Sequence, residues 1–269
     1  LILKDSILSY EAIRIEQNIL STNAISYSNL HNLKALEIEY NTNPKIKIKE
    51  KINADLFILN NGIYLSENKF TFGTNENFIQ DTALIWISNK NNKNIPENST
   101  LILGPYDTNP KTLIFKEEMN IDFEYKNDEI GIGIYYYDNK REEWVYLDTK
   151  YENGIYSAPI LSNEMFILLK ENNPPVIKSL IPDIDAIYKS NDINSMTFFI
   201  EDDLSGIAGI DNIIVKIDEV PVLFEYNTYK KQVLYNFEEW LTSGVHTLDI
   251  EIKDNVGNIT RKKGEFIIQ

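Results

Sequence analysis

The chain has 269 residues, of which 43% are hydrophobic and 25% charged, the balance of a folded protein with about two ordinary or three small domains. Its 41 acidic and 26 basic residues give a formal net charge of −15, which repels phosphate backbones and argues against nucleic acid as a partner. Cysteine is absent, which excludes disulfides and a cysteine nucleophile, and no apolar run approaches the roughly 18 residues of a membrane helix, so we expect no membrane insertion.

The chain opens at Leu1 with "LILKDSILSY", which has neither an initiator methionine nor the charged-then-apolar layout of a signal peptide. We therefore expect a covalently linked upstream domain. Residues 1–67 contain the strand-like runs "ALEIEY", "KIKIKEKI", "ADLFIL" and "GIYL", while "SYEAIRIEQNIL" fits either a strand or a short helix. This segment predicts a partial or irregular β domain.

Residues 68–172 hold a second series of strand signals and predict a β-sandwich module. In "KYENGIY", Asn153 and Gly154 predict a tight hairpin turn, because both residues tolerate positive φ. The strand-like runs are "ALIWISN", "STLILGPY", "KTLIF", "MNIDFEYK", "IGIGIYYYD", "EEWVYLD", "GIYSAPI" and "EMFILLKE".

The clearest boundary lies in "KENNPPVI", where two prolines form a short, stiff connector. Beyond it, residues 173–269 alternate apolar and polar side chains with period two, as in "HTLDIEIKD", which is typical of strands buried on one face. The seven runs are "VIKSLI", "INSMTFFIE", "NIIVKID", "VPVLFEYN", "KQVLYNF", "HTLDIEIKD" and "GEFIIQ". Seven short strands in under a hundred residues are typical of an immunoglobulin-like sandwich. The predicted fold class is all-β, with tandem β-sandwich domains of which the C-terminal one is immunoglobulin-like.

The order of motifs in the last hundred residues resembles that of bacterial immunoglobulin-like domains: "PPVI", "DDLSGI", "IIVKIDEVPVLFEYN" and then "GVHTLDIEIKDNVGN". The preceding stretch, from "LILGPYDTNPKTLIF" to "SNEMFILLKENNPPVI", resembles the β module found before that domain in some exported zinc metallopeptidases of the lysostaphin-like, cell-wall-cutting type. The resemblance says little about residues 1–67.

This resemblance implies a non-catalytic accessory or spacer region of an exported bacterial protein, placed outside the cytoplasm as a secreted, periplasmic or cell-surface chain. Lysostaphin-like peptidases hold zinc with two histidines and one aspartate and use another histidine in catalysis. This chain has only His31 and His246, in unrelated segments. We therefore expect no enzyme activity from it, and we expect any peptidase activity to belong to a domain outside it.

Acidic residues end two of the predicted strands, and they are the candidates for a calcium site. Ca²⁺ is bound by six to eight oxygen atoms, several of them from carboxylates. The candidate ligands are Asp202, Asp203, Asp254 and Asn258. No spaced Asp-x-Asp-x-Asp loop is present, and Asp202 and Asp203 would point to opposite faces within a strand.

The alternative, which we favour, is that these residues serve the loops. Asp202 and Asp254 would accept hydrogen bonds from loop amides, and Gly206 and Gly257 would form tight turns. No cofactor is then expected, and calcium remains the one metal to test.

Aromatic residues offer a different function, the binding of a cell-wall or surface glycan. In "IYYYD", Tyr135 and Tyr137 lie on one face of a predicted strand, and Trp144 lies on the next strand. If exposed, these rings would stack on sugars; the default expectation for them is packing in the core or at a sheet edge.

A free-standing hydrolase is the third class. No stretch singles out a catalytic carboxylate pair, and "LSGIAG" is not a nucleophile elbow. His246 begins a strand after "TSGV", and we expect a hydrogen-bonded surface histidine there.

Overall fold

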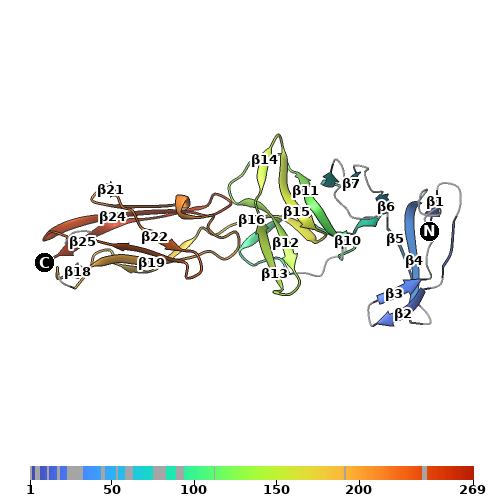
Figure 1. The fold of residues 1–269 in the computed structure, drawn as a ribbon, viewed down its shortest axis with the longest axis horizontal. Coiled ribbons are helices and arrows are strands. Elements are labelled where there is room, and N and C mark those ends of the chain that lie inside the picture. The colour runs from blue at the N-terminus through green and yellow to red at the C-terminus, as the bar shows by residue number, and fades with distance from the viewer. Residues whose placement is uncertain are drawn as a thin grey trace. The chain divides into compact units, whose positions relative to one another are not determined.

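The computed structural model of the chain describes residues 94–111, 113–190, 192–237 and 241–269, and upstream of these 2–3, 7–10, 12–16, 19–22, 33–43, 46–52, 54–57, 63–74 and 83–88. The regular elements in these ranges are β-strands, apart from one 3-10 turn, η1 (Ile210–Asn212) (Figure 1). The described residues include no helix with the length and apolar character needed to cross a membrane. The predicted all-β fold class is confirmed.

The chain divides into two compact units whose limits differ from the predicted domains. The first comprises Leu1–Asn94, Leu103–Asn127 and Thr149–Leu168, and the second Ile95–Ile102, Asp128–Asp148 and Leu169–Gln269. The predicted boundary between residues 67 and 68 lies inside the first unit, where β7 (Ile63–Glu67) pairs with β8 (Phe70–Thr74) across it. The predicted boundary between residues 172 and 173 lies inside the second.

Backbone hydrogen bonds explain why the second unit begins before the prolines. The Glu171 amide donates to the Gly131 carbonyl at 2.7 Å, and the Gly131 amide donates to the Val256 carbonyl at 2.9 Å. At Gly133 a Cβ atom would lie 2.8 Å from Cγ1 of Val256 and 2.9 Å from the ring of Tyr146, so only glycine permits this approach. Residues 128–148 therefore belong with the C-terminal residues.

The strands predicted before residue 68 are present, and "SYEAIRIEQNIL" contributes to two strands that pair with each other rather than to a helix. The smaller sheets are β1 (Ile2–Leu3)–β4 (Leu33–Asn43)–β5 (Ile46–Ile52) and β2 (Ala12–Glu16)–β3 (Ile19–Thr22).

Two larger sheets follow, and an aromatic core lies in the first unit. Phe70 stacks on Tyr106 with ring centroids 4.8 Å apart and meets Phe123 edge to face at 5.0 Å. In sheet order, the strands are β13 (Glu143–Leu147), β12 (Ile132–Asp138), β16 (Met165–Glu171), β10 (Ser99–Asn109), β9 (Ala83–Ser88) and β6 (Ala54–Phe57) in one sheet, and β14 (Lys150–Glu152), β15 (Ile155–Ser162), β11 (Ile114–Glu124), β8 (Phe70–Thr74) and β7 (Ile63–Glu67) in the other.

Two local features test the predictions in this region. Asn153 and Gly154 have φ of 52° and 86° and connect β14 to β15, so the predicted hairpin turn is confirmed. The runs "KTLIF" and "MNIDFEYK", predicted as two strands, contribute to the single strand β11, in which the register shifts between Ile114 and Met119. A β-bulge allows one strand to continue through residues whose alternation is interrupted.

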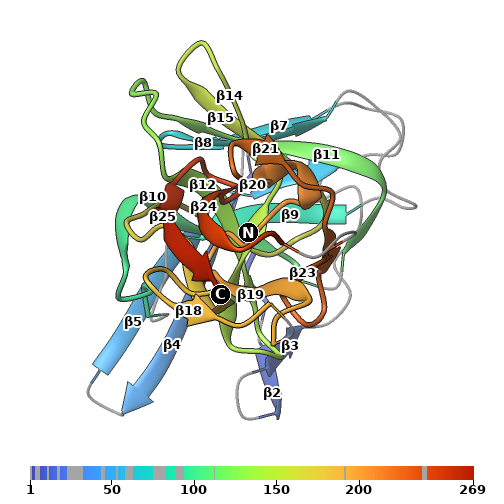
Figure 2. The same ribbon diagram turned by 90° about the vertical axis from the view of Figure 1, so that its left-hand side faces the viewer.

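The C-terminal residues form a sandwich of two sheets, as predicted (Figure 1). In Figure 2, where the C-terminus faces the viewer, β25 lies beside β24, and the two pair over ten residues. The sheets are β17 (Val176–Ile181)–β19 (Ser195–Glu201)–β23 (Gln232–Asn236)–β22 (Glu225–Asn227) and β18 (Ile187–Tyr188)–β25 (Ile259–Ile268)–β24 (Gly244–Lys253)–β20 (Ile213–Ile217)–β21 (Val220–Pro221).

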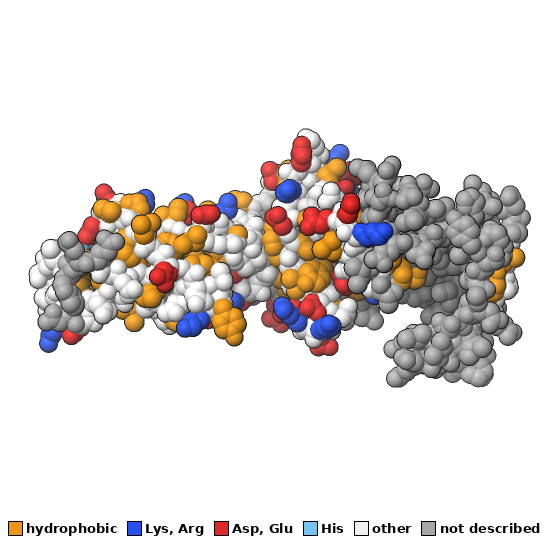
Figure 3. Space-filling view, viewed as in Figure 1, with side chains coloured by type: hydrophobic (Ala, Val, Ile, Leu, Met, Phe, Trp, Pro, Cys, Tyr) orange, Lys and Arg blue, Asp and Glu red, His pale blue; other side chains and the backbone are white. Residues whose placement is uncertain are grey.

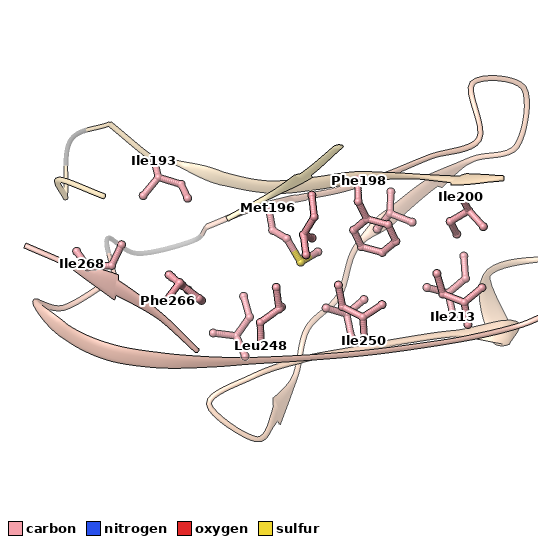
Figure 4. Close-up of a cluster of buried hydrophobic side chains, with 14 residues drawn as sticks. Ile193, Met196, Phe198, Ile200, Ile213, Leu248, Ile250, Phe266 and Ile268 are labelled. Atoms are coloured by element: carbon pink, nitrogen blue, oxygen red, sulfur yellow. The ribbon is translucent and has the colours of Figure 1, made fainter. Parts of the chain in front are cut away.

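The core between these sheets consists of the side chains that period-two alternation assigned to the inner faces. Met196, Phe198 and Ile200 on β19 face the side chains of β24 (Figure 4). Leu248, Ile250 and Ile252 are the β24 members, each at most 1% exposed. Burying such a side chain fully contributes about 1.5–3 kcal/mol, so this apolar layer is the main source of stability here.

We predict that Leu248→Ala lowers the free energy of unfolding of this sandwich by about 2–5 kcal/mol, because it removes buried methyl groups and leaves a cavity. Leu223, 92% exposed, is the matched control, and Leu223→Ala should stay within about 0.5 kcal/mol of the wild type. Urea unfolding curves measure both changes. Equal losses in the two variants would contradict the assignment of the core.

Candidate functional site

Three carboxylates from separate strand ends meet within the second unit. Glu171 is the last residue of β16, Asp202 follows β19, and Asp254 follows β24. One carboxylate oxygen from each lies within 4.8 Å of the others. Glu171 and Asp254 are 2% and 1% exposed, and Asp202 is half-buried. We call these three residues the carboxylate cluster.

Asp254 shapes the turn between β24 and β25. Its Oδ1 accepts hydrogen bonds from the amides of Val256 at 3.0 Å and Asn258 at 2.8 Å, and its Oδ2 accepts one from the Asn258 side chain at 2.8 Å. Gly257, with φ of 93°, supplies the left-handed position of the turn. The predicted loop role of both residues is confirmed.

Asp202 shapes the loop after β19 in the same way. Its Oδ2 accepts a hydrogen bond from the amide of Gly206, whose φ is 76°. Asn255 then joins this loop to the first one: its amide donates to the Gly206 carbonyl at 3.0 Å, and its side chain donates to the Ser205 carbonyl at 2.7 Å. The two loops are therefore held together, which brings Asp202 to Asp254.

Glu171 is the member that the sequence analysis missed. Its Oε2 accepts a hydrogen bond from the Ser205 amide at 3.2 Å, so the same loop also binds the end of β16. A signal for it exists in "FILLKE": with period two, Glu171 lies on the same strand face as Ile167 and Leu169, both fully buried. An acid that continues an apolar strand needs partners, although here Phe166 and Leu168 on the opposite face are buried as well, so alternation alone does not distinguish the two faces.

Burial raises the pKa of all three carboxyl groups of the cluster. Burial, with the charges of Asp202 and Asp254, raises the pKa of Glu171 to about 7 against the hydrogen bond from the Ser205 amide. Burial also raises the pKa of Asp202 and that of Asp254, in each case against hydrogen bonds from loop amides. Adjacent anions in a dry site cannot all remain ionised without compensation, so the cluster must take up a proton or a cation.

The hydroxyl of Tyr135 adds to this site. Tyr135 is 0% exposed, and its hydroxyl has no hydrogen-bond partner among the residues that the structure describes. Burial raises the pKa of Tyr135, and the negative charges of Glu171, Asp254 and Asp202 raise it too. A buried polar group without a partner is uncommon in a native protein and calls for an explanation such as a water or an ion.

The four residues predicted as calcium candidates divide into two groups. The structure brings Asp202 and Asp254 together with Glu171. Asp203 is exposed and lies outside the cluster, as expected for neighbouring residues that point to opposite sides. Asn258 serves Asp254 as a hydrogen-bond donor.

The aromatic residues proposed for glycan binding are buried, so this assignment is wrong for them. Tyr135, Tyr137 and Trp144 are 0%, 7% and 6% exposed, and Tyr137 meets Trp144 edge to face at 5.2 Å. The rings pack against other side chains rather than facing solvent, since Tyr135 also meets Tyr146 edge to face with ring centroids 5.6 Å apart. Rings without an exposed face cannot stack on a sugar.

His246 is hydrogen-bonded as predicted, but it is 6% exposed rather than on the surface. Its Nδ1 lies 2.6 Å from Oδ2 of Asp218, and its Nε2 lies 2.7 Å from the carbonyl of Thr242. Both partners are acceptors, so the ring donates from both nitrogens as an imidazolium and has no lone pair for general-base catalysis. His31 lies outside the described residues.

A groove of 540 Å³ reaches the cluster from solvent at Asp202. Its wall includes Pro174, Pro175 and Thr260, whose hydroxyl donates to the Pro175 carbonyl. Of the three cluster members, Asp202 is the one in the wall of this groove.

No protein-family model matches the chain, and comparison with curated proteins finds no match. Among solved structures, the extracellular domain of a putative one-component system from B. thetaiotaomicron is 11% identical, with a TM-score of 0.27, over 77% of this chain and 29% of that one. The extracellular domain of a putative hybrid two-component system from the same organism gives the same identity and TM-score over 77% and 31%. The chain thus spans less than a third of either structure, and we draw no functional conclusion from similarity at this level.

We predict that His246→Gln removes a pH-dependent part of the stability. Burial lowers the pKa of His246, but hydrogen bonds to Thr242 and Asp218 and the charge of Asp218 outweigh this and raise it. The stabilisation is then complete below the unfolded pKa of about 6.5 and is lost as pH rises through the folded pKa.

At the acid end the same stabilisation is lost as pH falls below about 4, because the pKa of Asp218 is lowered by its hydrogen bonds with His246 and Thr247, although burial opposes this. Unfolding free energies of wild type and variant at pH 5, 7 and 9 should therefore converge towards pH 9. A gap that widened between pH 6 and pH 9 would contradict the imidazolium assignment.

We predict that Glu171→Gln stabilises the protein in EDTA at pH 8.5 and has little effect at pH 5. The raised pKa means that ionised Glu171 is disfavoured in the folded state, so the wild type loses stability as pH rises from about 4.5 through about 7. Gln mimics the protonated acid. Thermal unfolding of both proteins at the two pH values measures this, with the exposed Glu225→Gln as the control for loss of one charge. If Glu171→Gln were less stable than the wild type in EDTA at pH 8.5, this prediction would be wrong.

Proposed function

We propose that the chain is a non-catalytic accessory and spacer region of a larger exported bacterial protein, located outside the cytoplasm. In this proposal it is covalently linked to a catalytic domain, and a cell-wall zinc peptidase of the lysostaphin-like type is the candidate. The order of motifs described above supports this assignment. The histidine content is consistent with it: two histidines in all are fewer than the three that such an active site uses.

The observation that supports the spacer role best is the use of buried polar groups within the second unit. Asp254, Asp202 and Glu171 each bind loop amides, and His246 binds a carboxylate and a carbonyl. These contacts hold strand ends and loops in one arrangement. A spacer requires that kind of stiffness, because it transmits position and performs no chemistry.

The proline connector is also fastened on both sides. The Asn172 amide donates to the Asn98 carbonyl at 3.0 Å, and the Asn172 side chain donates to the hydroxyl of Thr100 at 3.1 Å. Beyond the connector, the hydroxyl of Thr260 on β25 donates to the Pro175 carbonyl. The segment thus enters the C-terminal sandwich as a fixed element.

The surface suits a soluble spacer. In Figure 3 the charged side chains of the described residues are scattered among hydrophobic and uncharged ones. With a net charge of −15, the chain is repelled from anionic wall polymers as well as from nucleic acid. Such a region keeps a linked domain in solution at a set distance.

We predict that the purified chain, supplied with Zn²⁺, does not hydrolyse intact cell walls or soluble peptidoglycan peptides. The coding sequence upstream of Leu1 should continue into a domain with a His and Asp zinc set. Removing residues 1–269 from that protein should leave hydrolysis of soluble peptides unchanged and slow the digestion of intact walls. Turnover by the chain alone, abolished by His246→Gln, would overturn the proposal.

A further inference from the structure

The carboxylate cluster combines three negative charges with burial and little positive charge. The groups acting on Glu171 are two other carboxylates and the hydrogen bonds of Ser205. Lys231 is the basic side chain that acts on Asp202, and it is the smallest of the influences there. Ionised carboxylates in a low-dielectric site need a partner of opposite charge. The described side chains around the cluster provide little positive charge.

The hydrogen bonds of the cluster leave oxygen lone pairs available. A carboxylate can accept about four hydrogen bonds. Glu171 accepts from Ser205 through Oε2, and Asp202 accepts from Gly206 through Oδ2. Asp254 accepts three bonds over its two oxygens. Each residue therefore retains a lone pair, and the bonds already made fix the three side chains in position.

Tyr135 is the independent observation that points to a ligand. Its hydroxyl is fully buried and has no hydrogen-bond partner in the described part of the chain, and the charges of all three carboxylates act on it. A buried hydroxyl that lacks a hydrogen-bond partner destabilises the folded state, because the contacts it made with water are not replaced. A water molecule held by a cation in the cluster would give the hydroxyl a partner.

We propose that Glu171, Asp202 and Asp254 bind one divalent cation of the oxygen-preferring class, Ca²⁺, with a water on the cation hydrogen-bonded to Tyr135.

The ligand set selects the metal. All three ligands are carboxylates and neither histidine nor cysteine takes part, which favours hard cations over zinc and copper. Mg²⁺ demands an octahedral site and usually keeps several waters, whereas Ca²⁺ dehydrates more readily and accepts irregular and bidentate carboxylates. A site with two members at most 2% exposed therefore suits Ca²⁺ better.

The cation would tie the end of β16 to the ends of β19 and β24. Glu171 lies three residues before Pro174, so a bound ion fastens the entry of the connector into the sandwich. This stiffening role rests on the proposed spacer function, but cation binding does not. Failure to bind Ca²⁺ would contradict the cation site and leave the spacer function standing. Peptidase turnover by the chain would contradict the spacer function and leave the cation site standing.

The test is titration calorimetry of the EDTA-treated full chain with CaCl₂ at pH 8. We expect one site per chain and a rise in the unfolding temperature as Ca²⁺ increases. Asp202→Asn should weaken Ca²⁺ binding at least tenfold, whereas the neighbouring Asp203→Asn should change it less than twofold. No binding at 5 mM Ca²⁺, equal effects of the two variants, or tighter binding of Mg²⁺ would each overturn the proposal.

A second variant separates the site from the fold. Tyr135→Phe should raise the unfolding temperature in EDTA, because it removes a buried hydroxyl without a partner. With saturating Ca²⁺ the gain should shrink or reverse, because the hydroxyl then has a partner. A gain of the same size in both conditions would show that Tyr135 does not serve a bound cation, which would contradict the proposal.

Discussion

The buried carboxylate of Asp254 is the interaction on which the C-terminal sandwich depends. It accepts three hydrogen bonds from Val256 and Asn258 and so fixes the turn from β24 to β25, the longest strand pair of this sandwich. This turn also positions Asn255, which donates hydrogen bonds to the carbonyls of Ser205 and Gly206 in the loop after β19. A polar group placed at a strand end thus sets loop geometry, while the apolar layer between the sheets provides the stability.

The same hydrogen bonds have an electrostatic consequence. By drawing loops and strand ends together they also draw together Glu171, Asp202 and Asp254, whose charges repel one another. Removing any acid would relieve the repulsion but would leave loop amides without an acceptor. The proposed cation would balance the charges while the loop amides keep their acceptors, and a water bound to it would serve the Tyr135 hydroxyl, which has no partner among the described residues.

Local patterns in the sequence predicted the local structure. Period-two alternation assigned Met196, Phe198 and Ile200 to the core, and Asn153 with Gly154 predicted a hairpin, because these features depend on residues close in the chain. The two-residue strand β18 was missed because so short a strand has no period to recognise. The run "VPVLFEYN" was predicted as one strand, but it divides between β21 and β22, with residues 222–224 outside both.

The site depended on contacts that no local pattern encodes. Glu171 and Asp254 are 83 positions apart, and their proximity follows from the packing of residues 128–148 against the C-terminal loop, which also displaced the predicted boundary at residue 172. Tyr135 and Tyr137 were assigned correctly to one strand face, but alternation cannot say which face is covered. Which face is covered depends on the residues that pack over it, and the burial of Tyr135 and Tyr137 decides against glycan binding by these rings.

A crystal structure of the chain grown with Ca²⁺ at pH 8 tests the central claim most directly. The account predicts a strong density peak with oxygen atoms of Glu171, Asp202 and Asp254 at about 2.3–2.6 Å and a bound water within hydrogen-bond reach of the Tyr135 hydroxyl. Carboxylates hydrogen-bonded directly to one another, with no ion between them, would show that the cluster is balanced by protons and would contradict it.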